Sequence, residues 1–277
     1  MIKVQVSLVI IALNEEAGIA RCIESAKWVD EIIVVDSGSQ DRTQEIARSL
    51  GAQVVQENWR GYREQKVFAC SLAKNDWILS LDADEALSPN LSQILRELCS
   101  GIAHQSTDQL INFDFAKMDG IEFSRLSFNL GRWIAHGGWF PDWQLRFFHR
   151  GRTHWQASHV HERVHAANKI RLKESILHWP FESLSEQIAT NNHYSSLGAD
   201  DLLARGQKFS LAKLFFKPVS KFLETYAIKM GFLDGLAGFI ISVGAAYSTF
   251  LKYAKLWEKQ KREKESSSHS SYHLDAR

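Results

Sequence analysis

Cysteine is scarce in this chain, because only Cys22, Cys70 and Cys99 of its 277 residues carry a thiol. The three lie far apart and show no paired spacing, which excludes a disulfide framework and a zinc ribbon as the basis of the fold. All three fall in segments whose pattern predicts a helix. This cysteine usage is typical of a protein from a reducing compartment.

An excess of charge of either sign is also missing, since 33 lysines and arginines balance 32 aspartates and glutamates to a formal net charge of +1. This total argues against nucleic acid as the main partner. The first residues, MIKVQVSLVIIALNEE, alternate polar with apolar side chains and run into an acidic turn, which favours a strand over a signal peptide. We therefore expect no export.

Two nucleotide-binding signatures are absent as well. Neither G-x-G-x-x-G nor G-x-x-x-x-G-K-[ST] follows the first predicted strand, which argues against a nicotinamide-dependent enzyme and a P-loop ATPase.

What the sequence does contain is a regular alternation of strands and helices in its first hundred residues. Segments that predict strands cover residues 4–12, 31–36, 52–56 and 77–81, and helical patterns lie between them. Such alternation predicts an α/β fold with a parallel sheet and right-handed crossovers. Ligands of these sheets bind beyond the carboxyl ends of the strands.

Polar residues follow three of these strands. Asn14 and Glu15 follow the first, Asp36 ends the second, and the stretch ILSLDADEAL places Asp82 and Asp84 after the fourth. For Asn14 or Asp36 alone, a helix cap or a turn is an equally good interpretation. Three such strand ends at one rim predict a ligand site. Because neighbouring carboxylates repel one another, we expect a cation there.

These motifs resemble those of the family 2 inverting glycosyltransferases. VIIALNEE, IIVVDSGSQDRT and ILSLDADE occur in the family's order within the first 85 residues. The resemblance implies a Rossmann-like A-type glycosyltransferase fold, with a mixed, mainly parallel sheet that binds a nucleotide sugar. It also implies a divalent metal, Mg²⁺ or Mn²⁺, held by Asp84 with Asp82 as a second candidate ligand. This metal acts as a Lewis acid on the departing nucleoside diphosphate.

Matching the family motifs position by position implies roles for residues at the donor site. Asn14, Glu15 and Asp36 match positions that contact the uracil and ribose, and Asp82 is expected near the ribose or the sugar. Lys66, on the helix before the aspartate motif, is expected to reach the nucleotide or its phosphates. A solvated surface position is the alternative for Lys66.

The region from 101 to 205 is rich in Trp, Phe, His and Arg, most densely in GRWIAHGGWFPDWQLRFFHRG. Aromatic rings stack on sugar faces and arginine pairs bidentately with phosphate, so this composition predicts a phosphorylated saccharide acceptor. An aromatic core with charged edges is the alternative. The acceptor-binding candidates are Arg132, Trp139, Trp143 and Arg146.

An inverting transfer needs a general base for the acceptor hydroxyl, and Asp142 and Glu162 are the candidates. If SHVHERVH is a strand, alternation puts Glu162 on its apolar side, where desolvation suits a base. GGWFPDWQLRFF, VHERV and GFLDG further resemble the lipopolysaccharide-core β-1,4-glucosyltransferases. The usual acidic base motif of the family is not obvious in that branch, so we favour Asp142 and keep Glu162.

Histidines in the second half raise the alternative of a zinc site, as in a zinc hydrolase. No cysteine accompanies them and their spacing matches no closed site, so recognition of phosphate by arginine and histidine is preferred. These histidines are His154, His159, His161, His165 and His178.

The C-terminal segment changes character. Lys213, Lys217 and Lys221 recur four residues apart beside an apolar stripe, and no charge occurs from Gly235 to Leu251. That run is at the lower limit for a membrane span. Basic residues on both flanks favour amphipathic helices that lie in the inner face of a membrane. Helices packed on the catalytic domain, or forming a dimer, are the alternative.

The predicted organisation has four segments: a nucleotide-sugar-binding half at 1–100, an acceptor-binding half of the same domain at 101–205, membrane-associating helices at 206–257 and a disordered tail at 258–277. We expect a cytoplasmic, membrane-peripheral, metal-dependent transferase that moves glucose from UDP-glucose to a heptose of the lipopolysaccharide inner core. The alternatives are a transferase for another lipid-linked or cell-surface glycan and a non-catalytic nucleotide-sugar-binding scaffold. An oligomer formed through the C-terminal helices is a further alternative.

Overall fold

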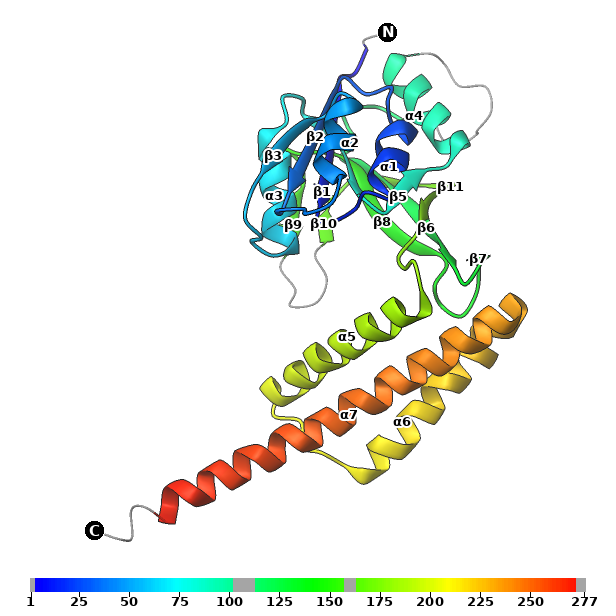
Figure 1. The fold of residues 1–277 in the computed structure, drawn as a ribbon. Coiled ribbons are helices and arrows are strands. Elements are labelled where there is room, and N and C mark those ends of the chain that lie inside the picture. The colour runs from blue at the N-terminus through cyan, green and yellow to red at the C-terminus, as the bar shows by residue number, and fades with distance from the viewer. Residues whose placement is uncertain (1–2, 102–112, 157–162, 273–277) are drawn as a thin grey trace. The chain divides into compact units, whose positions relative to one another are not determined.

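The computed structural model describes residues 3–101, 113–156 and 163–272. The chain divides into two compact units (Figure 1). Unit 1 is Met1–Phe128 with Phe140–Pro180, and unit 2 is Asn129–Trp139 with Phe181–Arg277. The predicted boundaries at residues 100 and 205 differ from this division. The helix that follows Phe181 packs on the C-terminal helices, so it belongs with them rather than with the sheet.

A mixed sheet forms the centre of unit 1. Its strands are β1 Val6–Ala12, β2 Glu31–Asp36, β3 Gln53–Gln56, β4 Trp77–Asp82, β5 Glu85–Leu87, β6 Gly120–Asn129, β8 Asp142–His149 and β11 Lys169–His178. They lie in the order β3-β2-β1-β4-β8-β6-β11-β5. The first four of that order are parallel, β8 is antiparallel to β4 and β6, and β11 is parallel to β6. The predicted mixed α/β sheet is confirmed.

The carboxyl ends of the parallel strands meet at one rim. Ala12 at the end of β1 pairs with Asp36 at the end of β2, and Ile11 pairs with Asp82 at the end of β4. The loops that follow these strands therefore start at the same edge of the sheet, as the alternation of elements predicted.

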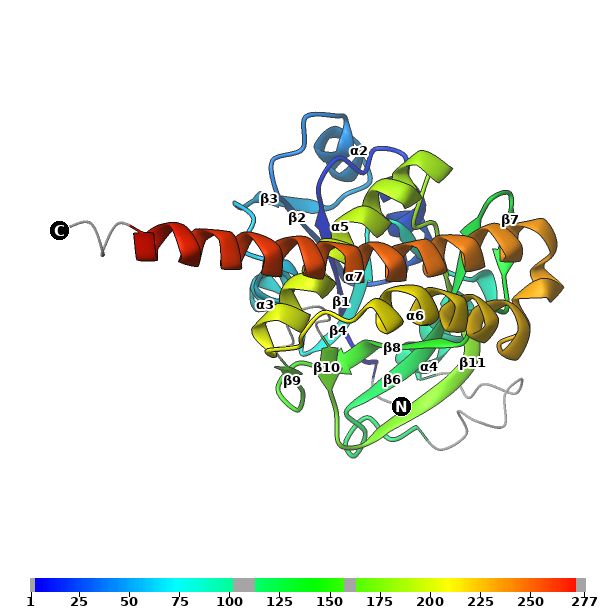
Figure 2. The same cartoon turned by 90° about the horizontal axis from the view of Figure 1, so that it is seen from below.

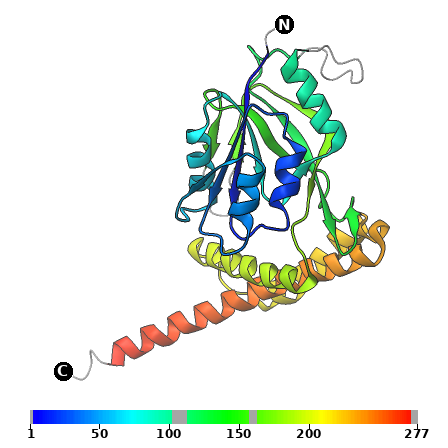
Figure 3. The ribbon, with the colours of Figure 1, turned by 45° about the horizontal axis from the view of Figure 1, so that its top comes forward.

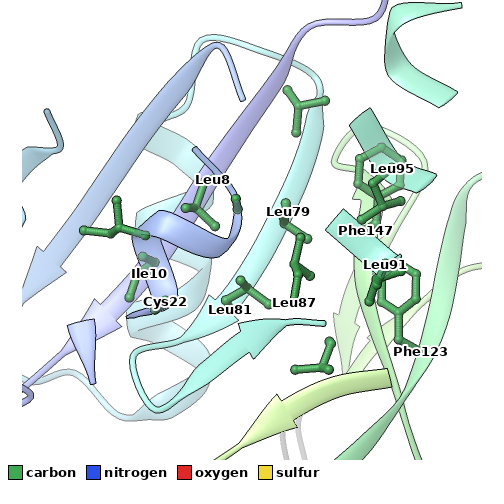
Figure 4. Close-up of a cluster of buried hydrophobic side chains, with 14 of the residues drawn as sticks. Leu8, Ile10, Cys22, Leu79, Leu81, Leu87, Leu91, Leu95, Phe123 and Phe147 are labelled. Carbon is green, nitrogen blue, oxygen red and sulfur yellow. The ribbon is translucent and has the colours of Figure 1, made fainter. Parts of the chain in front are cut away.

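Helices cover both faces of this sheet. They are α1 Ile19–Ser25, α2 Thr43–Ser49, α3 Tyr62–Leu72 and α4 Pro89–Ser100. Leu8 and Ile10 of β1 point into a core with α1, α2 and α4 (Figure 4), whereas Val9 points into a second core with α3. A strand buried on both faces is apolar throughout rather than alternating, which explains the sequence VSLVIIA. The three cysteines are buried in α1, α3 and α4, and no disulfide joins them, as predicted.

A short antiparallel pair completes the strands described in unit 1. It consists of β9 His154–Gln156 and β10 Arg163–His165. The rings of His154 and His165 stack across this pair with centroids 5.5 Å apart.

Unit 2 is mainly helical. Its elements are β7 Arg132–Ile134, α5 Leu184–Ala204, α6 Leu211–Leu223, the π-helix η1 Glu224–Ile228, the 3₁₀-helix η2 Gly231–Asp234 and α7 Gly235–Tyr272. Figure 3 shows α7, in orange and red, running along the yellow α6 and the yellow-green α5. Ala199 of α5 packs against Tyr253 and Leu256 of α7. Lys255 of α7 donates to the carbonyl oxygen of Asn192 at 2.7 Å.

The end of α7 differs from the sequence prediction, which placed a disordered tail from residue 258. The helix continues to Tyr272. Arg262 pairs with Glu258 at 2.5 Å and Lys261 lies 3.7 Å from Glu265, both at a spacing of four residues. Such pairs stabilise an exposed helix that has no apolar face to pack.

Candidate active site

Asp36 organises the loop after β2. The backbone amides of Gly38 and Ser39 donate to its Oδ1 at 3.0 and 2.9 Å, and Gln44 Nε2 donates to the same oxygen at 2.6 Å. The Ser39 hydroxyl donates to Oδ2. Asp36 is fully buried, so in this structure its charge fixes the loop conformation. Its predicted contact with the nucleotide stays a prediction.

The loop after β1 is tied to that loop. Asn14 adopts a φ of 55°, its amide donates to Ser39 Oγ at 2.8 Å, and its Oδ1 accepts from the Gln40 amide at 2.8 Å. The Glu15 amide donates to Thr43 Oγ1 at 2.7 Å. The structure thus brings Asn14 and Glu15 to the loop that Asp36 organises. Their contacts with the uracil and ribose stay a prediction.

Asp82, at the end of β4, is held between two cations. Lys66 Nζ on α3 lies 2.7 Å from Oδ1, and Arg146 Nη2 on β8 lies 2.5 Å from Oδ2. Burial alone would raise the pKa of Asp82, but the charges of Arg146 and Lys66 outweigh burial and hold it well below its usual range. Lys66 is 5% exposed, which rules out the alternative of a solvated surface position.

Glu85 extends this cluster into the interior. Its carboxylate is fully buried. Oε1 accepts hydrogen bonds from Arg146 Nη2 at 2.6 Å and from Arg125 Nη1 at 3.2 Å. Oε2 accepts from the Asp82 amide at 3.0 Å. Burial lowers the pKa of Arg146, but the two carboxylates more than reverse this and raise it above its usual value. The cation expected beside the aspartate motif is therefore supplied in part by the protein's own side chains.

Arg146 is the clearest departure from the sequence interpretation. We expected it to bind the acceptor, yet it is buried between Asp82 and Glu85. If this arginine turned to a phosphate, Asp82 would keep only Lys66 and Glu85 only Arg125 as cationic partners, so a role in acceptor binding is disfavoured. Arg146 belongs to the aspartate cluster because β8 lies next to β4 in the sheet.

Asp84 has a different partner. Its Oδ2 lies 3.2 Å from His178 Nε2, and its carbonyl oxygen accepts from the Trp179 amide at 3.0 Å. His178 Nδ1 lies 2.9 Å from Ser127 Oγ, which orients the ring. His178 ends β11, where it pairs with Glu85 of β5. The sequence interpretation named His178 only among the histidines, because no local pattern signals a strand pairing over such a separation.

The donor set of Asp84 and His178 fits a divalent cation. A carboxylate oxygen and an imidazole nitrogen about 3 Å apart have the separation of two neighbouring ligands of one ion. Both oxygens of Asp82 are engaged by Lys66 and Arg146, so Asp84 fits the role of metal ligand better than Asp82 does.

A larger protein-only metal site is not formed by the described parts of the chain, which contain no group of three or more His, Cys, Asp or Glu able to hold an ion. Most of the coordination shell would then come from substrate and water, as is usual for Mg²⁺ at phosphate sites. The zinc alternative finds no support among the described histidines. His159 and His161 lie outside the described residues.

A further cation lies beside this pair. The guanidinium of Arg21 on α1 stacks 3.5 Å from the ring centroid of Trp179, whose amide binds Asp84. Burial lowers the pKa of Arg21, and the negative charge of Asp84 partly offsets this. The helical pattern gave no reason to single out Arg21, because its partner is more than 150 residues away in the sequence.

Asp142, the favoured general base, begins β8 and is a third exposed. Arg125 donates to its Oδ2 from Nε at 2.9 Å, with Nη2 2.6 Å from the same oxygen, and Gln144 Nε2 donates to Oδ1 at 2.9 Å. Arg125 also binds Glu85, so Asp142 is joined to the aspartate cluster. The rival candidate Glu162 lies outside the described residues.

The acceptor candidates do not fall in one unit. Trp143 lies on β8 in unit 1, where Arg171 sits 4.8 Å from its ring centroid. Arg132 and Trp139 belong to unit 2. Arg132 is on β7, and Trp139 packs against the cluster formed around Ile134 of the same strand.

The motif GFLDG, which the sequence interpretation left without a role, anchors the segment around β7. Asp234 is buried; its Oδ2 accepts from the His136 amide at 2.8 Å, and its Oδ1 lies 3.1 Å from His136 Nδ1. Arg132 Nη2 lies 3.7 Å from Oδ1. The Gly137 amide donates to the Lys229 carbonyl oxygen at 2.8 Å. Two candidate acceptor residues, Arg132 and Trp139, therefore flank a loop that is fixed to the start of α7.

Known proteins are similar in sequence to this chain over most of its length. Residues 7–171 match the profile of Glycosyl transferase family 2. The chain is 35% identical over 263 residues to an uncharacterized glycosyltransferase of Rickettsia typhi, covering 92% of this chain and 87% of the relative. It is 32% identical over 270 residues to the lipopolysaccharide core biosynthesis glycosyltransferase LpsC of Rhizobium meliloti, covering 93% of each.

A solved structure shares a smaller part. It is glucosyl-3-phosphoglycerate synthase from Mycobacterium tuberculosis in complex with Mn²⁺, UDP and glucosyl-3-phosphoglycerate, 25% identical with a TM-score of 0.32, covering 45% of this chain and 44% of that one. At this TM-score the likeness carries no argument about ligands.

Proposed function

Because the chain belongs to the family 2 glycosyltransferases, with their A-type fold, we propose that it moves glucose from UDP-glucose onto a heptose of the lipopolysaccharide inner core, with inversion at the transferred carbon. The observation that carries this proposal is the aspartate cluster at the carboxyl rim of the parallel strands, where Asp82 is fixed by two cations and Asp84 faces His178. This is the edge at which α/β sheets bind their ligands.

Donor binding is assigned to the loops after β1, β2 and β4. Asn14, Glu15 and Asp36 would hold the uridine, since their loops are joined by hydrogen bonds before any ligand arrives. A preformed loop loses little conformational entropy on binding. Asp82, kept ionised by Arg146 and Lys66, would accept hydrogen bonds from ribose or sugar hydroxyls.

Diphosphate departure is assigned to the other side of the aspartate motif. Mg²⁺ or Mn²⁺, held there by Asp84 and His178, would supply charge neutralisation for the leaving nucleoside diphosphate. Arg21 lies next to this pair on the Trp179 ring and can add a second positive charge. Ser127 keeps His178 oriented through Nδ1.

Proton removal from the acceptor is assigned to Asp142, with Glu162 as the second candidate. Both oxygens of Asp142 already accept hydrogen bonds, from Arg125 and Gln144. Oδ2 is contacted by both Nε and Nη2 of Arg125, whereas Oδ1 accepts only from Gln144, so Oδ1 keeps a lone pair that can take the proton.

The acceptor and its location are inferred from the relative described as a lipopolysaccharide core glycosyltransferase, which matches this chain over nearly the whole length of both. Arg132, Trp139 and Trp143 are the proposed contacts of a phosphorylated saccharide. A lipid-linked acceptor and a soluble nucleotide sugar would meet at the cytoplasmic face of the inner membrane, where we place the reaction.

The test is release of UDP from UDP-glucose with Mn²⁺ and deep-rough lipopolysaccharide that ends near the inner heptose. Wild type is compared with Asp84→Ala and Asp142→Asn, and Asp200→Asn, an exposed aspartate of unit 2, is the control. We expect acceptor-dependent turnover in wild type and the control and a loss of about 100-fold or more in both site variants.

Other outcomes of this assay separate the alternatives. Turnover that persists in Asp142→Asn would move the base role to Glu162. Turnover with another sugar nucleotide or another glycan only would replace the donor or the acceptor. Nucleotide binding without turnover for any donor and acceptor would favour the non-catalytic scaffold.

A further inference from the structure

Helix α6 of unit 2 turns its apolar side chains outward. Among its residues none is buried, and Phe216 is 73% exposed. The apolar residues exposed on α6 are Leu211, Phe215, Phe216, Val219 and Leu223. Their spacing places them along one side of the helix. A helix of a water-soluble hairpin normally packs such a side inward, so this surface calls for a partner.

The apolar surface continues through the turn into α7. Ile228 is 77% and Leu236 is 75% exposed, and Met230, Phe232 and Leu233 between them are about half exposed. Figures 1 and 2 both show α6 and α7 lying side by side, joined by η1 and η2 at one end. We call this set of exposed apolar residues, from α6 through η2 to the first half of α7, the apolar face.

Helix α7 contributes only one stripe to the apolar face. Phe239, Val243, Tyr247 and Phe250 are exposed at intervals of three or four residues. The opposite side of α7 is buried by its neighbours in unit 2 through Ala237, Ile241, Tyr253 and Leu256.

This one-sided exposure bears on whether α7 spans a membrane. Residues Gly231–Glu265 are long and apolar enough to cross one by length and composition, but a third of the most apolar window is buried by protein. Lys252 and Lys255 then follow within the helix. A helix that exposes one stripe and packs on its other side suits a position parallel to a lipid surface rather than across it.

The charge of this region identifies the kind of surface. Residues 206–257 contain seven lysines and only two acidic residues, Glu224 and Asp234, although the whole chain has a formal net charge of +1. Asp234 is buried and bound to His136, and Glu224 lies 2.6 Å from Lys229. A helix pair that combines an exposed apolar face with an excess of lysine matches a bilayer with anionic headgroups.

We propose that the apolar face lies in the interfacial layer of an anionic lipid bilayer, with α6 and α7 parallel to the membrane plane and no crossing. The biological reason for this contact rests on the proposed function, a transfer to a lipid-linked acceptor. The contact itself depends only on the apolar face and its lysines. The loop after β7, which Asp234 fixes to the start of α7, would then belong to the membrane-bound unit.

The experiment is sedimentation of the purified full-length chain with vesicles of equimolar phosphatidylethanolamine and phosphatidylglycerol, compared with phosphatidylcholine vesicles. No sugar donor or lipopolysaccharide is present, so the outcome is independent of the proposed reaction. We expect binding to the anionic vesicles that weakens as salt is added. Absence of binding by the wild-type chain would overturn the proposal.

Matched variants assign the binding to this face. Phe215→Ser with Phe216→Ser should weaken vesicle binding at least tenfold, roughly the effect of losing two inserted rings. Ile188→Ser with Tyr194→Ser removes two half-exposed apolar side chains of α5, outside the face, and should change little. Lys213→Glu with Lys217→Glu should abolish the preference for anionic lipid. Equal effects of the α6 and α5 variants would contradict the proposal.

Two further measurements separate the competing arrangements. Alkaline carbonate should release the bound protein from membranes; retention in the pellet would show that α7 spans and would overturn the parallel position. Light scattering should find that the Phe215→Ser, Phe216→Ser variant has the same mass as wild type. If wild type is a dimer and the variant is a monomer, the apolar face would instead be assigned to contact with a second copy of the chain.

Discussion

Glu85 in unit 1 is a fully buried charge, whereas Phe216 in unit 2 is an apolar ring that is mostly exposed. Both reverse the usual distribution, in which charges lie outside and rings inside. In unit 1 the reversal is compensated within the protein, because Arg146 and Arg125 contact the buried carboxylate. In unit 2 nothing described in the chain covers the ring. A buried charge that the protein's own cations compensate can form part of a binding site. An exposed apolar surface that no described part of the chain covers indicates contact with a partner.

The largest effect is expected from removing the compensation in unit 1. Arg146→Met keeps most of the side-chain volume but leaves Asp82 and Glu85 without their shared cation, so the free energy of unfolding should fall by about 3–5 kcal/mol. Arg42→Met, which breaks an exposed pair with Glu45, should leave the free energy of unfolding close to that of wild type. Urea unfolding of both variants checks this. Equal losses of unfolding free energy in the two variants would show that the buried cluster contributes no more to stability than an exposed ion pair.

The next effect concerns the backbone that carries the aspartate motif. A Cβ on Gly18 would lie 2.7 Å from the carbonyl oxygen of Ala83, so Gly18→Ala must displace the turn between Asp82 and Asp84. We expect about a tenfold or greater loss of kcat together with about 1–3 kcal/mol of stability. Gly151→Ala, whose Cβ would meet only ordinary contacts, is the control. Unchanged kinetics in Gly18→Ala would mean that the turn tolerates the shift.

In unit 2 we would change the buried carboxylate Asp234 to asparagine. The amide keeps the shape but weakens the bonds to His136 and the attraction to Arg132, so the loop after β7 should loosen. The KM for the lipopolysaccharide acceptor should rise about tenfold, while slow hydrolysis of UDP-glucose without acceptor stays unchanged. Asp200→Asn is again the control. If both reactions fall together, the role of Asp234 is not confined to the acceptor.

The smallest effect tests how well unit 1 excludes water. Burial raises the pKa of Cys70 and Cys99 to about 12, and burial with the nearby carboxylates raises that of Cys22. Since the thiolate is the reactive form, none should react with a disulfide reagent at neutral pH until the protein unfolds. Ser49→Cys, at an exposed position, should react at once. Rapid reaction of a native thiol would show a loosely packed core.

The sequence predicted the parallel half of the sheet and its polar rim because both follow from local periodicity and from a general rule of topology. It did not predict the contacts of Arg146 with Asp82 and Glu85 or of His178 with Asp84. Their positions depend on β8 pairing with β4 and on β11 pairing with β5, and no local pattern encodes those long-range pairings.

Local signals also failed in two places. Asn14 was a candidate helix cap, but α1 begins only at Ile19, because Asn14 bonds instead to the loop after β2. The polar composition after residue 258 suggested disorder, yet ion pairs at helical spacing accompany a continuous helix to Tyr272. In both cases the conformation is accompanied by contacts between polar side chains, which the spacing of apolar residues does not reveal.

Mn²⁺ binding, measured by electron paramagnetic resonance with and without UDP, tests whether the aspartate motif holds a divalent cation through Asp84 and His178. We expect one tightly bound Mn²⁺ per chain in the presence of UDP, lost in Asp84→Ala and weakened about 10–100-fold in His178→Ala. His154→Ala, on β9, should bind as wild type does. Equal Mn²⁺ binding in wild type, Asp84→Ala and His178→Ala would show that these two residues do not hold the cation.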